Sequence, residues 1–186
     1  MEFTAFPKIP RLSRECIITE KIDGTNASVF IGDNGEFLTG SRNRWITPDN
    51  DNMGFSRWAH EHKDELLLLG PGHHFGEWWG SGIQRRYGLK EKRFSLFNTH
   101  RWGKVYQATK EGHETTFPKC CYVVPVVMVG EFSSELVESA LAILRLQGSF
   151  ASPGFTDPEG IVIYHTAANC VFKKTMDDDG RPKSLK

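Results

Sequence analysis

A lysine followed two residues later by Asp-Gly, at positions 21–24, is the stretch of this sequence best suited to covalent chemistry. A free lysine side chain is almost wholly protonated at pH 7. A lysine nucleophile therefore needs neighbouring cations and an electrophile whose negative charge is screened. Attack on a nucleotide phosphate also needs carboxylates for a divalent metal and for the ribose. This chemistry predicts one lysine on a turn, further Lys or Arg nearby, and separate carboxylates on strands.

Groups of these kinds follow the Lys21 motif in a fixed order. They are Ser41-Arg42, Gly76-Glu77, Phe94–Phe97, Glu159-Gly160 and Lys173-Lys174. A lone K-x-D-G is a weak pattern, whereas six motifs in order at plausible intervals are a strong one. The order resembles the covalent nucleotidyltransferase superfamily of ATP-dependent ligases and mRNA capping enzymes. The resemblance covers roughly residues 15–175.

Three stretches resemble the nick-sealing, double-strand type of ATP-dependent RNA ligase. KIDGTN places Asn26 five residues after the lysine, where DNA ligases commonly carry an arginine. FGEWWGSGIQRRYG looks like the glutamate motif of that family followed by a G-x-x-Q-x-x-Y-G type segment. RFSLFNTHRW looks like its aromatic motif, although many relatives have Asp where Asn98 stands.

The resemblance implies which residues carry the reaction. Lys21 would be the nucleophile that takes AMP in phosphoramidate linkage. Glu159 would hold a metal, directly or through water, and Asp23 would sit by that metal or pin the turn. Lys173 and Lys174 would bind the triphosphate and orient the leaving pyrophosphate.

The resemblance also implies a set of residues that bind the nucleotide. Arg42 would contact the nucleotide or its phosphates, and Glu77 would hydrogen-bond the ribose hydroxyls. Phe97 would stack on the purine. Asn26 would act near the phosphate or the reacting strands, and Glu20 would accept from an adenine amino group.

Plainer explanations exist for three of these residues. Glu77 would look the same if it only paired with an arginine. Phe97 lies in an apolar strand pattern and would look the same in a hydrophobic core. Glu159-Gly160, after Pro158, would look the same as a turn into a strand.

The final lysine pair departs from the pattern of relatives, which usually show two lysines separated by one residue. Lys173 and Lys174 point to opposite faces if the segment is a strand, so they are not expected to do the same job. Phe172 or Thr175 occupies the place of one of the usual lysines. Which lysine is essential stays open at this point.

The elements predicted around these motifs are mostly short strands without regular strand–helix–strand alternation. Strands are predicted over 15–22, 26–31, 36–40, 73–79, 94–98, 122–131, 159–165 and 170–175, and helices over 54–69 and 134–147. Asn52 is the expected cap and Gly70 the expected stop of the first helix. Pro125 weakens the middle of 122–131. We expect an α+β fold of mostly antiparallel sheets with flanking helices, which the resemblance implies to be a nucleotidyltransferase (ATP-grasp-like) domain.

Length and composition set limits on organisation and partners. The chain has 186 residues, 39% of them hydrophobic, which predicts one packed domain over 1–186. The resemblance further implies a nucleotidyltransferase domain alone, without an OB-fold or other C-terminal module. The residues after Thr175 are expected to be exposed and partly mobile. Formal charge balances at 23 against 23, so a nucleic-acid partner needs a local basic patch. Residues 42–45, 84–93 and 99–104 supply either such a patch or solvated loops.

Cysteine and histidine placement favours no disulfide framework and no transition-metal site. The four cysteines contain no C-x-x-C pair, which favours reduced thiols in the cytoplasm. No signal peptide or membrane span is expected. His60 and His62 are two apart on a predicted helix, and His73–His74 lacks ligand companions at the right spacing, so structural roles are expected.

The resemblance implies an ATP-dependent RNA ligase that joins 3′-hydroxyl and 5′-phosphate ends through a lysyl-AMP and an adenylylated 5′ end. Its cofactors would be ATP and Mg²⁺ or Mn²⁺. Its partner would be nucleic acid, a nicked duplex or RNA with such ends, bound by a monomer. The alternatives are a minimal ATP-dependent DNA ligase, a capping-type guanylyltransferase, and a catalytically inactive nucleic-acid-binding module.

Overall fold

The computed structural model describes residues 2–177, which form two compact units. The first unit contains, of the described residues, 2–21, 126–150 and 156–177. The second unit contains residues 22–125 and 151–155. The expectation of a single domain over 1–186 stays a prediction. The part of the predicted mobile tail beyond Asp177 lies outside the described residues.

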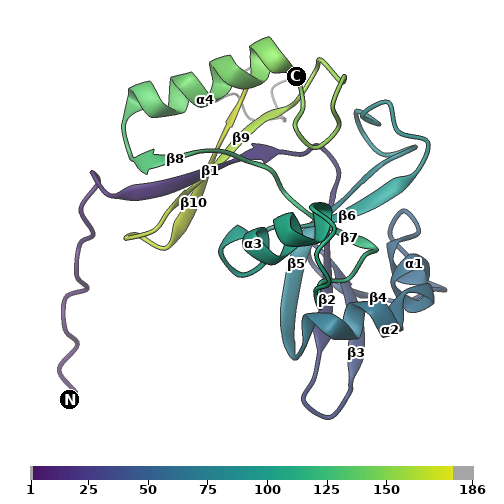
Figure 1. The fold of residues 1–186 in the computed structure, drawn as a ribbon. Coiled ribbons are helices and arrows are strands. Elements are labelled where there is room, and N and C mark those ends of the chain that lie inside the picture. The colour runs from purple at the N-terminus through teal and green to yellow at the C-terminus, as the bar shows by residue number, and fades with distance from the viewer. Residues whose placement is uncertain (1, 178–186) are drawn as a thin grey trace. The chain divides into compact units, whose positions relative to one another are not determined.

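The first unit is a four-stranded antiparallel sheet with one helix along one face (Figure 1). Its strands are β1 (Glu15–Lys21), β8 (Val126–Glu131), β9 (Gly160–His165) and β10 (Cys170–Thr175), in the order β10-β9-β1-β8. Helix α4 (Ser134–Gln147) has the predicted bounds. Ser133 caps it by accepting a hydrogen bond from Leu136 N, and Gly148 ends it at φ 78°.

Side-chain alternation gives the two faces of this sheet different roles. Cys16 and Ile18 of β1 pack with Ile161 and Ile163 of β9 and with the apolar side of α4. Because side chains alternate along a strand, Lys21 lies on the face opposite α4. The core therefore fixes which face carries the lysine.

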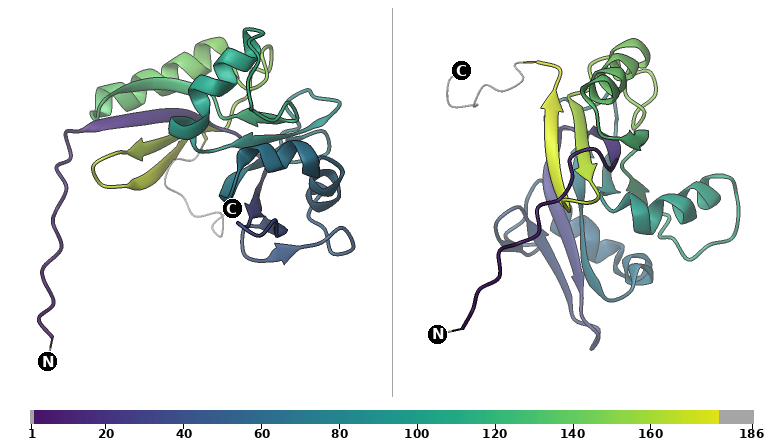
Figure 2. Two further views of the ribbon diagram at one scale, coloured as in Figure 1. Left: turned by 60° about the horizontal axis from the view of Figure 1, so that its bottom comes forward. Right: turned by 90° about the vertical axis from the view of Figure 1, so that its left-hand side faces the viewer.

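The second unit is built on a six-stranded sheet in the order β4-β3-β2-β5-β6-β7, antiparallel except for the parallel pair β6–β7. Its strands are β2 (Thr25–Ile31), β3 (Phe37–Ser41), β4 (Trp45–Ile46), β5 (Gly72–Gly80), β6 (Lys92–Leu96) and β7 (Cys121–Val123). Its helices are α1 (Phe55–Glu61), α2 (Lys63–Leu66), the 3-10 turn η1 (Leu67–Leu69) and α3 (Thr99–Lys110). Figure 2 gives two further views of these elements.

One face of the six-stranded sheet carries the main core of this unit. Ala27, Val29, Trp78, Phe94 and Leu96 project from this face and pack against the buried residues of α1, α2 and η1. We call it the core face. Residues at alternate positions project from the opposite side, which we call the outer face.

The predicted helix over 54–69 is broken into three pieces. His62 leaves the helical region at φ −107° and ψ 19°, between α1 and α2. The expected cap at Asn52 is wrong, because the carboxylate of Asp51 accepts from the backbone N–H groups of Ser56 and Arg57. Gly70 ends the last turn, as expected, at φ 72°.

Two other expectations also need correction. The strand predicted over 122–131 is two strands in two different sheets, β7 and β8, which part at Pro125 because proline cannot donate to a strand ladder. Residues 99–104 belong to α3 and are not a loop. Asn98 caps α3 by accepting from Arg101 N at 2.9 Å.

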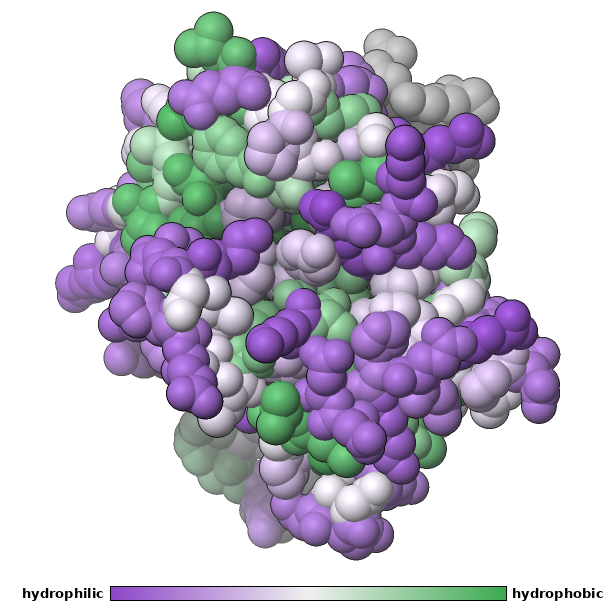
Figure 3. All heavy atoms as spheres, turned by 45° about the vertical axis from the view of Figure 1, so that its right-hand side comes forward, coloured by the Kyte–Doolittle hydropathy of each residue, from purple (hydrophilic) through white to green (hydrophobic). Residues whose placement is uncertain are grey.

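Hydrophilic side chains cover most of the face drawn in Figure 3, and hydrophobic ones form smaller separate patches there. The helices within residues 2–177 are each too short or too polar to cross a membrane. The four cysteines are free thiols, as expected.

Burial of His74 predicts a pH dependence of stability. The side chain is 4% exposed, and its Nε2 lies 2.8 Å from Gly70 O. Burial lowers the pKa of His74 below its ordinary value near 6.5, and Arg101 adds to the lowering. The unfolded chain then binds the proton more readily, so the free energy of unfolding should fall as the pH drops below 6.5 toward the lowered pKa.

Urea unfolding at pH 7.5 and at several pH values down to 5 measures this effect. The stability of His74→Asn should depend less on pH than that of the wild type over this range. His113→Asn is the matched control, because its side chain is 69% exposed. Equal slopes for the wild type and His74→Asn would contradict the prediction.

Candidate active site

Lys21 and Glu159 are brought together by the pairing of β1 with β9. Lys21 is the last residue of β1 and lies opposite Gly160, and Glu159 directly precedes that glycine. Lys21 Nζ donates to Glu159 Oε2 in an ion pair. The two side chains are 23% and 11% exposed, so the nitrogen is neither in open solvent nor sealed in the core. The structure therefore places the predicted nucleophile against the predicted metal ligand.

Gly160 is required by the close packing of β9 on β10. It has a φ of 153°, and a Cβ there would overlap the backbone of Lys174 and lie 2.7 Å from Thr175 Cα. The Glu-Gly pair is thus the start of a strand in which glycine lets the last strand approach. The register that follows fixes the position of Glu159.

The two C-terminal lysines lie on opposite faces, as their alternation predicted. Lys174 pairs with Ile161 on the α4 side, and its Nζ lies 2.6 Å from Glu138 Oε1 on α4. The hydrogen bond from Lys174 lowers the pKa of Glu138. Lys173 pairs with Val162, is exposed, and shares the face of Lys21. Two strand spacings and two residues along the strand put the Cα atoms of Lys173 and Lys21 about 12 Å apart.

Glu20 is enclosed on the α4 side of the sheet. Glu20 is 1% exposed, and its carboxylate accepts from Ser149 Oγ at 2.6 Å and from Phe150 N at 2.8 Å. These bonds fix the segment that follows α4. Contact of Glu20 with an adenine amino group stays a prediction.

In the second unit, Glu77 holds the turn that follows the lysine motif. Its Oε1 accepts from Gly24 N at 3.1 Å, and its Oε2 accepts from Asn26 Nδ2 at 3.4 Å. A Cβ on Gly24 would overlap Trp78 O and lie 2.7 Å from Trp79 Cβ. The glycine of K-x-D-G is therefore needed because the turn packs directly on β5.

Asp23 is bound by two residues to which the sequence assigned no role. Its backbone N donates to Tyr87 Oη at 2.9 Å, and its Oδ2 lies 3.3 Å from Arg85 Nε. These contacts favour the alternative in which Asp23 pins the turn. The sequence signal nearest to these contacts is the Y-G pair of FGEWWGSGIQRRYG. This pair resembles the family pattern but does not by itself predict a contact with Asp23.

The loop that carries Tyr87 adopts unusual backbone angles. Gln84, Arg86 and Tyr87 have φ values of 43°, 60° and 51°. A positive φ at a non-glycine residue costs about 1–3 kcal/mol of conformational free energy. Such a conformation persists where surrounding contacts determine it. Tyr87 is 1% exposed and packs in a small cluster with Trp79. The strained loop thus buries the ring that holds Asp23.

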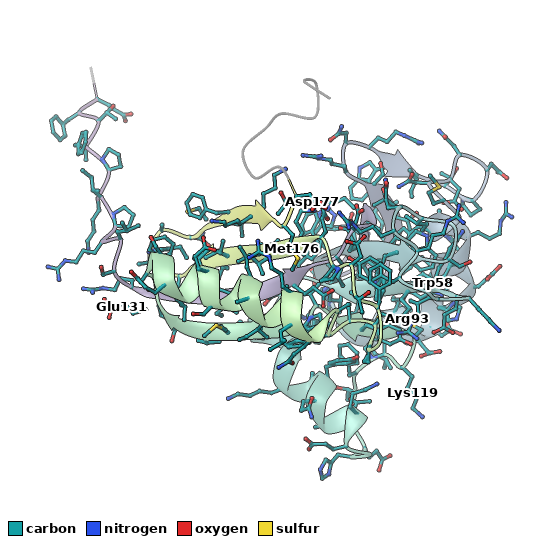
Figure 4. All side chains as sticks on the ribbon, turned by 90° about the horizontal axis from the view of Figure 1, so that it is seen from above. Trp58, Arg93, Lys119, Glu131, Met176 and Asp177 are labelled. Carbon is teal, nitrogen blue, oxygen red and sulfur yellow. The ribbon has the colours of Figure 1, made fainter. Side chains whose placement is uncertain are left out.

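The basic run over 84–93 is partly engaged within the second unit. Arg93, labelled in Figure 4, bonds to Glu91 Oε1 at 2.6 Å and lies 4.8 Å from the ring centroid of Tyr122. Lys92 Nζ donates to Met53 O at 2.7 Å. These cations bond to other residues of the unit, so the run is not simply a solvated loop.

The outer face of the six-stranded sheet carries two of the predicted nucleotide-binding residues, Asn26 and Glu77, and two others, Arg42 and Phe97, directly follow its strands β3 and β6. Asn26 pairs with Glu77 across β2 and β5, and Phe97 N donates to Phe75 O just beyond β6. Phe97 is 39% exposed, so its alternative role in the core is wrong. Arg42 is exposed and follows β3 directly.

Comparison with known proteins identifies the family. The model of the RNA ligase family matches residues 14–176 of this chain. The chain belongs to the RNA ligase family. No curated protein sequence matches it significantly.

Solved structures of the Naegleria gruberi RNA ligase resemble this RNA ligase family chain in fold. A variant with ATP and Mn has a TM-score of 0.65 and 21% identity, covering 89% of this chain and 51% of that one. The structure of the enzyme with PPi has a TM-score of 0.61 and 21% identity, covering 88% of this chain and 50% of that one. The chain therefore spans about half the length of these relatives. The α+β fold with mostly antiparallel sheets is confirmed.

The histidines of this RNA ligase family chain bond to their own unit. Nδ1 of His60 and His62 each lie 2.8 Å from a backbone oxygen one turn earlier, and His73 Nε2 lies 2.9 Å from Ser28 Oγ. Within residues 2–177, no three His, Cys, Asp or Glu side chains converge as metal ligands. These contacts agree with structural roles.

Gly24 offers a test of the close packing in the ligase motif. Gly24→Ala should lower the free energy of unfolding by about 1–3 kcal/mol, because the added methyl group is forced against β5. Gly103→Ala is the matched control: a Cβ there meets nothing within 4 Å, and alanine in α3 should stabilise by about 0.5–1 kcal/mol. Urea unfolding measures both. An unchanged or raised stability of Gly24→Ala would contradict the packing argument.

Proposed function

We propose that this chain is an ATP-dependent RNA ligase that joins 3′-hydroxyl and 5′-phosphate ends through a covalent AMP on Lys21. The observation that carries the proposal is the pairing of Lys21 with Glu159 on a sheet face that also carries Lys173. An amine, a carboxylate and a second cation on one face are the groups that attack on a nucleotide phosphate requires.

The reaction would consist of three phosphoryl transfers, of which the first two use Lys21. Its neutral amine attacks the α-phosphorus of ATP, a nitrogen–phosphorus bond forms, and pyrophosphate leaves. Glu159 Oε2 is placed to accept the proton that the amine must lose. An RNA 5′-phosphate then attacks the lysine-bound AMP and frees the lysine. A 3′-hydroxyl finally displaces AMP and seals the strand.

The other residues of the first unit would stabilise charge. Lys173 shares the face of Lys21 and would bind the β- and γ-phosphates as the pyrophosphate leaves. Lys174 is paired with Glu138, so it would hold β10 against α4 rather than bind ATP. Glu20 would position the segment that follows α4, where it accepts from Phe150 N. As the resemblance implies, it would alternatively accept from the adenine amino group.

Residues of the second unit would bind the nucleoside. Glu77 would accept from the ribose hydroxyls, and the exposed ring of Phe97 would stack on the purine. Arg42 would contact the phosphates, and Asn26 would act near the α-phosphate or the reacting ends. Asp23 would keep the turn in place and, as the resemblance also allows, lie near a metal.

A divalent metal, Mg²⁺ or Mn²⁺, fits the donor set. Mg²⁺ usually keeps several waters and binds one or two carboxylates together with substrate phosphates. Glu159 supplies such a carboxylate beside the nucleophile, and the Naegleria structures contain Mn. The ion would supply positive charge for the phosphate oxygens.

The finer assignments rest on the resemblance in sequence. Asn26 favours the nick-sealing type of RNA ligase over a DNA ligase, and free thiols suit a reducing cytoplasm. A capping-type guanylyltransferase would use GTP rather than ATP. An inactive binding module would form no adduct at all.

Incubation with α-labelled ATP and Mg²⁺ tests the function. The expected result is an acid-stable labelled protein, with the label mapped to the peptide that contains Lys21 and with much weaker labelling by GTP. Nicked duplexes with RNA or DNA 3′ ends then distinguish the two ligases. Folded protein that takes no label from ATP would refute the proposal.

A further inference from the structure

Four aromatic rings lie together on the outer face of the six-stranded sheet, away from the core. They come from neighbouring strands: Phe30 from β2, Trp45 from β4, and His73 and Phe75 from β5. The register places them on one face, because Trp45 pairs with Gly40, Gly40 with Ser28, and Ser28 with Phe75. We call these four residues the aromatic patch.

The rings of the aromatic patch order one another. Trp45 stacks on His73 with ring centroids 5.4 Å apart, and the ring centroids of His73 and Phe75 are 4.0 Å apart. Phe30 meets the Trp45 and His73 rings edge-on, at 6.2 and 6.0 Å. Partial desolvation lowers the pKa of His73, so its ring is neutral at pH 7 and stacks as an aromatic surface.

The aromatic patch remains accessible although its rings are large and apolar. Trp45 is 52% and Phe75 50% exposed. None of the four rings belongs to the hydrophobic clusters of the second unit. Large exposed apolar surface of this kind marks an interaction site more often than chance.

Charge and position both indicate the kind of ligand. Arg42 and Arg44 are exposed in the turn that leads into Trp45, and Arg44 Nη1 bonds to Asn50 O at 3.4 Å. Phe97 continues the patch, because its backbone bonds to Phe75. The strip from β6 to β4 is about 19 Å wide, which spans a few nucleotides.

We propose that the aromatic patch binds unpaired bases of a single-stranded nucleic-acid segment, with Arg44 on its phosphates. The proposal rests on the proposed ligase function. Flat rings with few charges suit exposed bases, which stack on any aromatic surface whatever their sequence. A duplex exposes its phosphates and stacks its base faces inside, so this patch can make few contacts with it.

Fluorescence anisotropy without ATP tests the proposal with a labelled 12-nucleotide RNA of mixed sequence and, separately, a blunt duplex of the same sequence. Trp45→Ala and Phe75→Ala should each weaken single-strand binding about 5- to 100-fold and leave duplex binding unchanged. Trp45→Phe should keep most of the affinity. Leu146→Ala, at an 85% exposed position of α4 in the first unit, is the matched control and should bind as the wild type does.

Three outcomes would overturn the proposal. The first is wild-type RNA affinity in cooperatively unfolding Trp45→Ala and Phe75→Ala. The second is an equal loss of single-strand and duplex binding. The third is concentration-dependent self-association that disappears in Trp45→Ala while RNA binding persists, which would assign the patch to a second copy. Adduct formation by the wild type is measured separately, so failure of this inference is distinguishable from failure of the ligase function.

Discussion

Lys21→Ala is expected to abolish the labelled protein adduct, by more than about 1,000-fold in rate, while the chain still unfolds cooperatively. Neither Lys173 nor Lys174 is expected to replace this amine, because Lys173 starts about 12 Å away at its Cα and Lys174 lies on the other side of the sheet. The measurement is the initial rate of acid-stable labelling from α-labelled ATP and Mg²⁺. Lys110→Ala, at an exposed position of α3, should label at the wild-type rate.

Lys21→Arg separates loss of the nucleophile from loss of the ion pair. Arginine keeps a positive charge for Glu159, but its guanidinium does not give up a proton in proteins and does not attack. We therefore expect no adduct from Lys21→Arg, with stability closer to that of the wild type than in Lys21→Ala. Labelling of either variant at the wild-type rate would place the nucleophile elsewhere.

Lys173→Ala should slow adduct formation by about 100-fold, whereas Lys174→Ala should slow it by less than about threefold. Removing one charged group from a transition state typically costs 10²–10³-fold in rate, and only Lys173 shares the face of Lys21. Lys174 is engaged by Glu138 on α4 instead. Initial rates at saturating ATP measure the difference.

Glu138→Gln is the matched control for the second lysine. It removes the ion pair of Lys174 without changing the strand, and it should reproduce the small effect of Lys174→Ala on labelling. If Lys174→Ala lost the adduct and Lys173→Ala kept it, the face opposite α4 would not be where the triphosphate binds. Equal large losses would mean that both lysines reach ATP.

Local signals in the sequence were sufficient for some elements and not for others. Helix α4 was predicted because Ser133, Gly148 and an apolar stripe agree on its bounds. Helix α3 is not among the predicted elements, because the basic residues at its start indicate a patch or a solvated loop equally well. Yet Trp102, Val105 and Tyr106 have the helical spacing and pack against the core.

Other differences depend on contacts that no local pattern carries. Strand 122–131 divides because its two halves join sheets whose other members are distant in sequence. The opposite directions of Lys173 and Lys174 followed from strand alternation, and this prediction is confirmed. Their different partners did not follow, because Glu138 reaches Lys174 only through the packing of α4. The bonds of Asp23 to Arg85 and Tyr87 likewise depend on how the loop folds.

The position of β1 in its sheet has a consequence for how the protein is made. This strand precedes both of its sheet neighbours in the sequence, yet it lies between β8 and β9, and Glu15 pairs with Glu131. Its neighbours emerge more than a hundred residues later, so its ladder closes late and its formation should be slow. The amine of Lys21 is thus synthesised well before the carboxylate of Glu159 with which it pairs.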